Sequence, residues 1–227
     1  MSDRGPTSDP AKLPAHMAAA VRDWPAYYDR VAGEPPRKTL LEAVEAFANA
    51  RGPETAGAGR EPLLAVDLGC GDGRDTQALL ERGWSVIACD PHEEGLRRLR
   101  LRPLCALAER EGRLKVQLAD FKASRFGRVD LVNASFALPF CPPEDFSSVW
   151  KMIDESLTTG GRFSGQLFGD RDSWVELGDR THLTRAQVMA MFDRYVLENF
   201  REEDRASTYT DDAHKHWHVY HIVARKR

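Results

Sequence analysis

The sequence alternates between short apolar runs and segments in which apolar residues recur every three or four positions. The short runs are typical of buried β-strands, and the longer period is typical of amphipathic helices. Strands are predicted at residues 63–68, 84–90, 114–120, 129–134, 162–168, 195–200 and 217–224. Helices are predicted at 36–50, after Gly73, around Leu96 and Leu99, and at 143–157 and 184–192. This alternation predicts an α/β fold with a mostly parallel sheet in three layers.

The length of 227 residues favours one folded domain, because about 100–200 residues per domain is usual. Residues 1–14 are rich in Ser, Asp, Gly and Pro, a composition typical of a disordered tail. We therefore predict a disordered segment or N-terminal extension at residues 1–22 and a single domain at residues 23–227.

Charge and cysteine usage exclude several classes of protein. A formal net charge of -3 gives no basic footprint for a nucleic acid partner. The four cysteines include no C-x-x-C pair, which argues against a zinc site or a disulfide framework and favours a reducing compartment. The longest apolar stretch near the start, residues 17–21, is too short for a signal-peptide core or a membrane span. The sequence predicts a cytoplasmic protein with no nucleic acid or membrane partner.

The pattern changes after Asp67, where the apolar run breaks into glycines at alternate positions, Gly69, Gly71 and Gly73. A strand, a glycine turn and a helix start form a place where backbone can approach a ligand closely. A dinucleotide fingerprint, G-x-G-x-x-G, would need a third glycine where Arg74 stands. The spacing is instead D-x-G-x-G-x-G, which argues against a nicotinamide-dependent oxidoreductase.

Three acids, Asp67, Asp90 and Asp120, lie at or near the ends of three successive predicted strands. A ligand of an open α/β sheet binds outside these carboxyl ends. Asp90 follows the glycine turn by about 20 residues, the offset at which a carboxylate accepts hydrogen bonds from ribose hydroxyls. Asp120 is placed to accept from an exocyclic amine, with Phe121 beside it to cover an adenine face. Acids would repel a pyrophosphate and attract a cation, so the predicted cofactor is S-adenosylmethionine, which carries an ammonium and a sulfonium.

Each acid also has a simpler interpretation, because aspartate commonly starts a turn at a strand end. The phase of all three with the glycine turn favours the site. The arginine group that follows Leu96 is interpreted as a solvated helix face; its members are Arg97, Arg98, Arg100 and Arg102.

The glycine turn with Asp90 and Asp120 resembles the motifs of class I S-adenosylmethionine-dependent methyltransferases. Residues 134–143, 161–174 and 216–226 are similar to segments of small bacterial methyltransferases of the tellurite-resistance type. The resemblance implies a Rossmann-like sheet of seven strands, with helices on both sides and the seventh strand antiparallel. It also implies that residues just after the fourth strand line the cofactor. The predicted cofactor residues are Asp67, Gly69, Cys70, Gly71, Gly73, Asp90, Pro91, Asp120, Phe121, Asn133, Ala134, Phe136 and Tyr28.

Tyr28 belongs to an aromatic stretch at residues 23–30. Aromatic residues mostly pack, so this stretch is interpreted as a cap on one end of the core. The alternative is a lid over the cofactor, with Tyr28 or Arg37 near its edge.

Three histidines, His214, His216 and His218, are the candidate catalytic bases. Alternate positions share one face of a strand, and the beginning of an antiparallel seventh strand would lie at the rim of the site. His221 would lie deeper and be structural. The alternative is that all of them are hydrogen-bonded core histidines. A metal site is not predicted, because no acid or cysteine stands at ligand spacing near them. Beyond the fifth strand, Arg171 is interpreted as pairing with its acidic neighbours or orienting an anionic substrate.

The predicted function is methyl transfer from S-adenosylmethionine to a small molecule, a thiol, oxyanion or hydroxyl, by in-line displacement. A soft nucleophile needs no base, whereas an alcohol or phenol does. The alternative is a non-catalytic module that binds S-adenosylmethionine or S-adenosylhomocysteine. The two differ in whether a methylated product forms.

Overall fold

The computed structural model describes residues 14–51, 62–207 and 215–227, without the side chain of Arg51. The chain divides into two compact units, one ending at Glu34 and the other beginning at Pro35. In the first unit, α1 spans Ala15–Ala20 and α2 spans Trp24–Arg30, where the Asp23 side chain caps α2 by accepting from Ala26 N. The division into residues 1–22 and 23–227 stays a prediction, and the tail at 1–13 lies outside the described residues.

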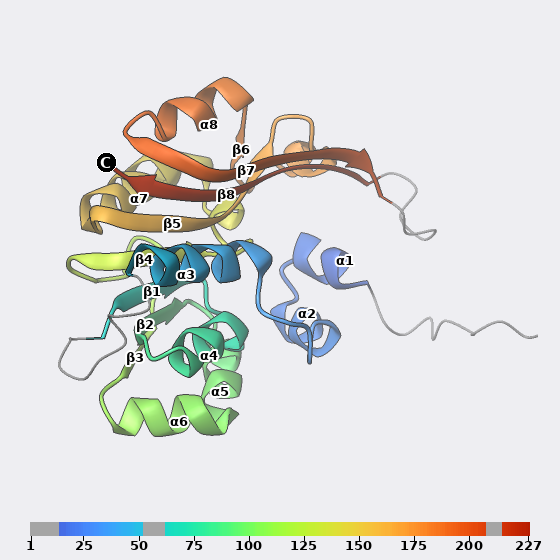
Figure 1. The fold of residues 1–227 in the computed structure, drawn as a ribbon. Helices are drawn as coiled ribbons and strands as arrows, with labels where there is room; N and C mark the ends of the chain where they lie inside the picture. The colour runs from blue at the N-terminus through green and yellow to red at the C-terminus, as the bar shows by residue number, and fades with distance from the viewer. Residues whose placement is uncertain (1–13, 52–61, 208–214) are drawn as a thin grey trace, which may run out of the picture. The chain divides into compact units, whose positions relative to one another are not determined.

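The second unit is built on one sheet with the strand order β3-β2-β1-β4-β5-β8-β7 (Figure 1). Its strands are β1 (Leu64–Leu68), β2 (Ser85–Asp90), β3 (Leu114–Leu118), β4 (Val129–Ala134), β5 (Leu157–Gly169), β7 (Tyr195–Ala206) and β8 (His216–Lys226). The first five run parallel, and β8 is antiparallel to both β5 and β7. A two-residue strand, β6 (His182–Leu183), pairs with β5 beside this path. The predicted mostly parallel sheet with an antiparallel final strand is confirmed.

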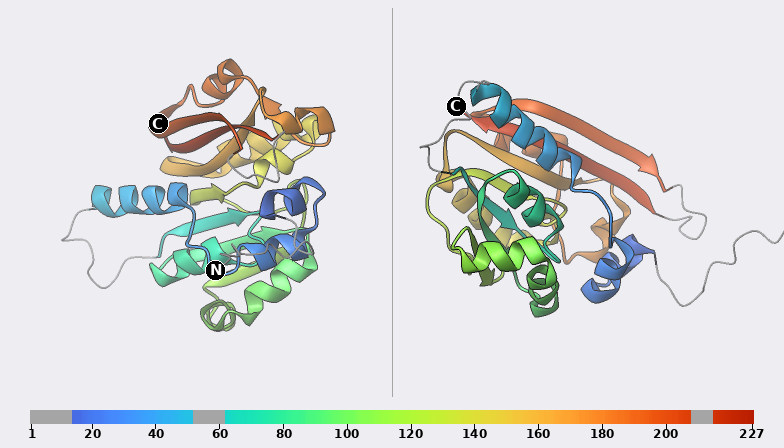
Figure 2. Two further views of the ribbon diagram at one scale, coloured as in Figure 1. Left: turned by 90° about the vertical axis from the view of Figure 1, so that its right-hand side faces the viewer. Right: turned by 60° about the horizontal axis from the view of Figure 1, so that its bottom comes forward.

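Helices cover both faces of the sheet (Figure 2). They are α3 (Lys38–Arg51), α4 (Arg74–Glu81), α5 (Glu93–Leu101), α6 (Pro103–Arg110), α7 (Pro143–Ser156) and α8 (Arg185–Met191). One apolar cluster joins α3, α4, α5 and α6 to one face of the sheet, and another joins α7 and α8 to the opposite face. Neighbouring residues of β1 divide between the two, since Ala65 packs in the first cluster and Val66 in the second. This alternation explains why the buried strands read as continuous apolar runs.

Several elements differ from the prediction in length. β5 begins at Leu157, ahead of the predicted start at residue 162, and Gly160, with φ +81, lies inside the strand at an irregularity in its pairing with β4. β7 continues to Ala206, well past the predicted end. The residues added to β7 are mostly charged and partly exposed, so the apolar pattern carried no signal for them. Helices α1 and α6 and the 3-10 turns η2 (Leu138–Phe140) and η3 (Ser173–Leu177) were also not predicted.

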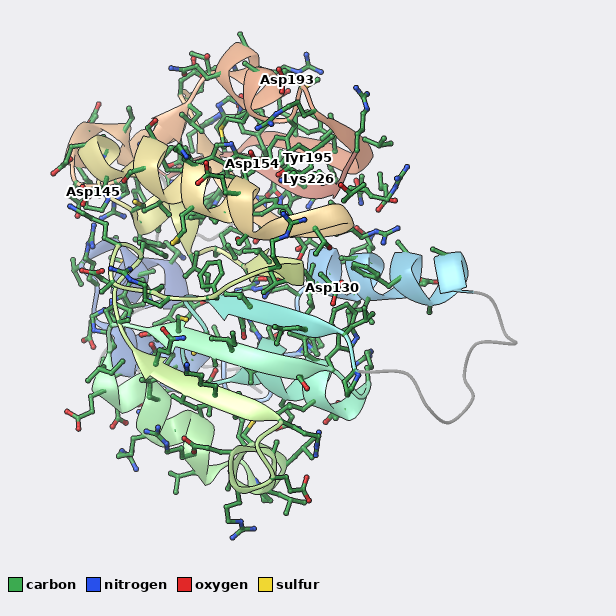
Figure 3. The ribbon with its side chains drawn as sticks, turned by 90° about the vertical axis from the view of Figure 1, so that its left-hand side faces the viewer. Asp130, Asp145, Asp154, Asp193, Tyr195 and Lys226 are labelled. Atoms are coloured by element: carbon green, nitrogen blue, oxygen red, sulfur yellow. The ribbon has the colours of Figure 1, made fainter. Side chains whose placement is uncertain are left out.

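At the amino ends of the parallel strands, polar side chains tie α7 to the antiparallel pair (Figure 3). Asp154 of α7 accepts a hydrogen bond from Tyr195 Oη at 2.7 Å and forms an ion pair with Arg194. Lys226 lies 3.7 Å from the same carboxylate and donates to Leu157 O. This network holds β7 and β8 in place away from the predicted cofactor site. Among the described residues, no helix combines the length and apolar character needed to cross a membrane.

Candidate active site

Most of the predicted cofactor residues lie at the carboxyl ends of β1, β2 and β4, whereas Asp120 and Phe121 follow β3 and Tyr28 is on α2 of the first compact unit. Strand order reverses between β1 and β4, the position at which open α/β sheets bind ligands. The turn after β1 is fixed by two backbone bonds, from Gly69 N and Cys70 N to Cys89 O, at 2.8 and 3.1 Å. Gly69, Gly71 and Gly73 have φ values of +75, +54 and +83, so each occupies the left-handed region that favours glycine.

Asp67 lies beneath this turn and is 1% exposed. Its Oδ2 accepts from Thr76 Oγ1 at 2.6 Å, and its Oδ1 accepts from Asn133 Nδ2 at 2.9 Å. The same Nδ2 donates to Asp75 Oδ2 at 3.2 Å. Burial, and then the nearby Asp75 carboxylate, raise the pKa of Asp67 to about 7. A buried acid with a strongly raised pKa is typical of a functional site.

Asp90 ends β2 directly beside the glycine turn. Its Oδ2 accepts from Gly71 N at 2.9 Å and its Oδ1 from His92 N at 2.8 Å, which fixes the carboxylate at the sheet edge. Burial raises the pKa of Asp90, and the two backbone hydrogen bonds oppose that rise. The side chain therefore links the turn to the neighbouring strand, and its assignment to the ribose stays a prediction.

Asp90→Ala is expected to weaken S-adenosylhomocysteine binding at least tenfold, about 1.4 kcal/mol for a lost charge-assisted contact. Isothermal titration against both proteins measures this. An unchanged affinity would mean that another acid holds the ribose.

Arg102, one member of the arginine group, bonds to the glycine turn through Asp72. Arg102 Nε donates to Asp72 O at 2.7 Å, and Arg102 Nη2 donates to Asp72 Oδ2 at 2.6 Å. The other arginines form ion pairs at the surface, Arg97 and Arg98 with Glu94 and Arg100 with Glu109. The interpretation as a solvated helix face holds for Arg97, Arg98 and Arg100. Arg102 differs, because it follows the last residue of α5 and bonds to the glycine turn at Asp72.

The adenine residues lie beyond β3. Asp120 is exposed, and its Oδ1 accepts from Ala123 N at 2.7 Å. Phe121 is half-buried against the apolar cluster of α7 and α8. Pro91 is exposed beyond Asp90. Asp120 is thus a turn-starting aspartate that also faces solvent at the edge where the other acids gather.

The segment after β4 is held by side-chain hydrogen bonds. Asn133 Oδ1 accepts from Ser135 Oγ at 3.0 Å and from Ser164 Oγ at 2.8 Å, and Ala134 ends the strand fully buried. Phe136 has φ +50, a backbone conformation that non-glycine residues rarely adopt and that is common at functional sites. Its N–H donates to Gln166 Oε1 at 2.9 Å, which holds the turn against β5.

Arg37 lies next to this segment. Its N–H donates to Asp75 Oδ1 at 3.0 Å, and its guanidinium stands 4.7 Å from the centre of the Phe136 ring. Tyr28 is on α2 in the first compact unit. The two interpretations of its segment, a cap on one end of the core or a lid over the cofactor, both stay predictions.

The candidate catalytic histidines are engaged in contacts within the protein. His214 lies outside the described residues. His218 is fully buried, accepts at Nδ1 from Arg171 N at 3.0 Å and has Nε2 2.9 Å from Glu202 Oε1. His216 is partly exposed, with Nε2 2.6 Å from Asp204 Oδ1. A catalytic role for these histidines stays a prediction.

Glu202, Asp204 and His218 bring possible metal-ligand atoms within 4.8 Å of one another. The Arg171 guanidinium already lies in this cluster, 2.9 Å from Glu202 and 2.6 Å from Asp204. It supplies the positive charge there, so the cluster is an ion-pair network. Arg171 pairs with acids, as one of its two interpretations expected, although the partners on β7 are distant in sequence.

His221 lies on the other face of β8 from His216 and His218, because odd and even positions of a strand face opposite sides. It stands opposite Gln166 in the β5–β8 pairing, and its ring meets the Phe136 ring edge-on at 6.0 Å. The structural role predicted for His221 stays a prediction. Its contact with Phe136 places His221 beside the segment that follows β4.

The residues present fit S-adenosylmethionine better than a pyrophosphate. Asp67, Asp75 and Asp90 are all buried at this edge, and Asp75 stands in the first turn of α4 where a phosphate would need to approach. A Cβ at Gly69 would lie 2.4 Å from the Cβ of Ala137, so the turn is already packed tightly from one side. A cationic cofactor suits this donor and acceptor set.

Comparisons with known proteins agree with this geometry. A family model described as Methyltransferase domain matches residues 66–163, and no curated protein sequence matches the chain. The structure is similar to TehB from Haemophilus influenzae, with 17% identity, 90% of this chain and 67% of that chain covered, and a TM-score of 0.67.

Two other similar structures hold ligands. One is 1,6-didemethyltoxoflavin-N1-methyltransferase from Burkholderia thailandensis with 1,6-didemethyltoxoflavin and S-adenosylhomocysteine bound, at 19% identity, 98% and 94% coverage and a TM-score of 0.58. The other is magnesium protoporphyrin IX methyltransferase from Synechocystis PCC 6803 with bound S-adenosylmethionine, at 16% identity, 96% and 99% coverage and a TM-score of 0.60. At these identities, the likeness confirms the predicted fold.

Proposed function

We propose that the chain is an S-adenosylmethionine-dependent methyltransferase of the class I fold and that its methyl acceptor is a small molecule. The net charge of -3 gives no basic face for a nucleic acid, which supports a small acceptor. All four cysteines are free and buried, which favours the reducing cytoplasm as the compartment.

The observation that carries this proposal is the bond between the glycine turn and Asp90, within the segment that matches the methyltransferase family. In the proposed arrangement, Asp90 holds the ribose hydroxyls, and Asp120 and Phe121 hold the adenine. The turn at Gly69, Cys70, Gly71 and Gly73 admits the amino-acid moiety, and the buried Asp67 adds negative charge beneath it. Asn133, Ala134 and Phe136 line the cofactor on the side of β4.

Bound S-adenosylmethionine supplies an electrophilic methyl group on its sulfonium, and the thioether that leaves is neutral. The protein then contributes mainly positioning and the exclusion of water. The acid cluster is suited to hold the cation, and the aromatic segment at Phe136 is suited to shield the reacting centre. A base is required only when the acceptor holds a proton that must leave.

Thermal denaturation tests the cofactor. S-adenosylhomocysteine is expected to raise the melting temperature, because a ligand at 100 times its Kd stabilises by about 2.7 kcal/mol. NADH is expected to leave the melting temperature unchanged. The reverse result would remove the cofactor assignment.

A second measurement separates the enzyme from the binding-only alternative. Release of S-adenosylhomocysteine is followed with a panel of thiols, phenols and oxyanions. Methylated product from any acceptor supports the enzyme. Cofactor binding with no product across the panel would favour the non-catalytic module.

A further inference from the structure

The predicted cofactor residues lie in spatial order along the sheet, with Asp120 beyond β3, Asp90 on β2 and Asp67 on β1. The adenine end therefore lies over β3 and the methyl end near β1 and β4. The acceptor must approach from the next strands in the order, β5 and β8. We propose that His221 of β8, held by Glu203, is the base that removes a proton from the acceptor. This inference rests on the proposed function.

Strand register places His221 at the edge of the site. Ala134, the last residue of β4, pairs with Gly165, and the next residue of β5, Gln166, pairs with His221. His221 is thus level with the first residue beyond β4. Gln166 also accepts from Phe136 N, so the Phe136 turn and His221 meet on the same stretch of β5.

The face of the sheet agrees with this position. Asp67 pairs with Asn133, Asn133 pairs with Ser164, and Gln166 and His221 follow on that same side. His221 therefore shares a face with the buried acid of the cofactor turn. His216 and His218 point to the opposite face, and His216 is about 17 Å further along the strand at 3.3 Å per residue.

The side chain of His221 has the arrangement of an oriented base. Its Nε2 lies 3.1 Å from Glu203 Oε2, and an ionised carboxylate can only accept, so the proton sits on Nε2. Nδ1 then keeps its lone pair, and no described residue hydrogen-bonds to it. The side chain is 13% exposed, which leaves a route for a small acceptor. A base held by a third group is the usual pattern of acid–base sites.

The charges around His221 favour the neutral ring. Burial lowers the pKa of His221, Arg201 and Arg37 lower it further, and the bond to Glu203 opposes them. Burial raises the pKa of Glu203, but the hydrogen bonds from Arg201 and His221 outweigh this effect, so its pKa lies below the usual value. A neutral imidazole beside a carboxylate can accept a proton at neutral pH.

The step balances with these groups. The acceptor heteroatom forms a bond to the methyl carbon, and the carbon–sulfur bond breaks with its electron pair passing to sulfur. The acceptor proton moves to Nδ1 of His221, and the imidazolium is stabilised by Glu203 until water removes the proton. The acceptor class is therefore one with a proton to lose, a hydroxyl, phenol or N–H group. The Phe136 ring beside His221 suits a planar acceptor.

Proton NMR of the full chain tests the position of His221 without an acceptor. The C2–H signal of His221, assigned by its absence in His221→Gln, is titrated with pH in S-adenosylmethionine and in S-adenosylhomocysteine. The sulfonium charge is expected to move the His221 midpoint lower than in the neutral-sulfur product, while the C2–H signal of His216 serves as the matched control and is expected to have the same chemical shift with both ligands. Equal midpoints at His221, or a shift at His216 instead, would overturn the inference with the cofactor assignment intact. Failure of both ligands to bind would overturn the proposed function and this inference with it.

Turnover gives the second readout, with p-nitrophenol, dithiothreitol and tellurite as probes. His221→Gln is expected to lower kcat on the phenol about 100-fold with the KM for S-adenosylmethionine unchanged. Glu203→Gln is expected to lower it less, because it only orients the ring. Wild-type turnover confined to tellurite, or a phenol rate in His221→Gln close to that of the wild type, would contradict the role of His221.

Discussion

Gly69→Ala is expected to destabilise the protein by about 2–5 kcal/mol and to abolish cofactor binding. Gly69 has φ +75, where a Cβ costs about 1–2 kcal/mol. The added Cβ would also lie 2.4 Å from the Cβ of Ala137, and overpacking of this kind costs about 1–3 kcal/mol. The turn can relieve the contact only by moving the backbone that Gly69 N and Cys70 N fix on Cys89 O.

Two further variants separate the causes of this loss. Gly83→Ala is the matched control, because Gly83 has φ +79 and no atom within 4 Å of the added Cβ. It is expected to lose about 1–2 kcal/mol and to bind S-adenosylhomocysteine as the wild type does. Adding Ala137→Gly to Gly69→Ala removes the contacting Cβ, so part of the stability is expected to return.

Urea denaturation and S-adenosylhomocysteine titration of the three variants measure these effects. If Gly69→Ala were no less stable than Gly83→Ala, the contact with Ala137 would carry no energy. If the double variant bound cofactor no better than Gly69→Ala, the conformation of Gly69 alone would decide the shape of the turn.

The cofactor turn could be predicted from the sequence because its determinants are local. An apolar run, alternating glycines and a following amphipathic helix lie within about twenty residues, so Asp67 and Gly69 needed no knowledge of distant contacts. Asp90 could be predicted because it lies at a fixed distance in sequence from the glycine turn, within the same strand–helix–strand unit. The structure shows Asp90 bonded to the turn and Asp67 buried next to it.

The acceptor side could not be predicted in the same way, because it depends on pairing between distant strands. β7 extends beyond the edge of the parallel strands through charged residues, and β5 and β8 extend beside it. As a result, His216 lies beyond the end of β4, and His221 lies level with the end of β4. This position is the basis for proposing His221 as the base. The contact of Arg102 could not be predicted for the same reason, since its partner Asp72 is thirty residues away in sequence and lies in the glycine turn.

Asp67→Asn is expected to make the protein more stable than the wild type at pH 8 and to lose this advantage at pH 5. The pKa of Asp67 is raised from 3.8 to about 7, chiefly by burial and then by Asp75. A raised pKa means that the folded state binds a proton which the unfolded state releases. That stabilisation is complete below about 3.8 and disappears as the pH rises through about 7.

The magnitude follows from the pH interval. Since pH 5 lies about two units below the folded pKa and each unit is worth about 1.36 kcal/mol, wild-type stability falls by about 3 kcal/mol relative to Asp67→Asn between pH 5 and pH 8. The amide introduced by Asp67→Asn does not titrate, and it can still bond to Thr76 and Asn133. Urea denaturation of both proteins at the two pH values measures the difference.

Glu202→Gln provides the control of opposite sign. The hydrogen bond from His218 lowers the pKa of Glu202 despite its partial burial. Its stabilisation is present above about 4.5 and is lost as the pH falls below that value, so Glu202→Gln is expected to cost the same at pH 5 and pH 8. The same pH dependence of stability in wild type and Asp67→Asn would show that Asp67 does not carry the proton.

The same raised pKa couples Asp67 to the cofactor. A cation bound above the turn favours the ionised carboxylate, so binding of S-adenosylmethionine near pH 7 is expected to release part of a proton. Calorimetry in buffers with different ionisation enthalpies measures this release, and Asp67→Asn is expected to remove it. The buried acid that destabilises the free protein at pH 8 is therefore the group whose charge the bound cofactor compensates.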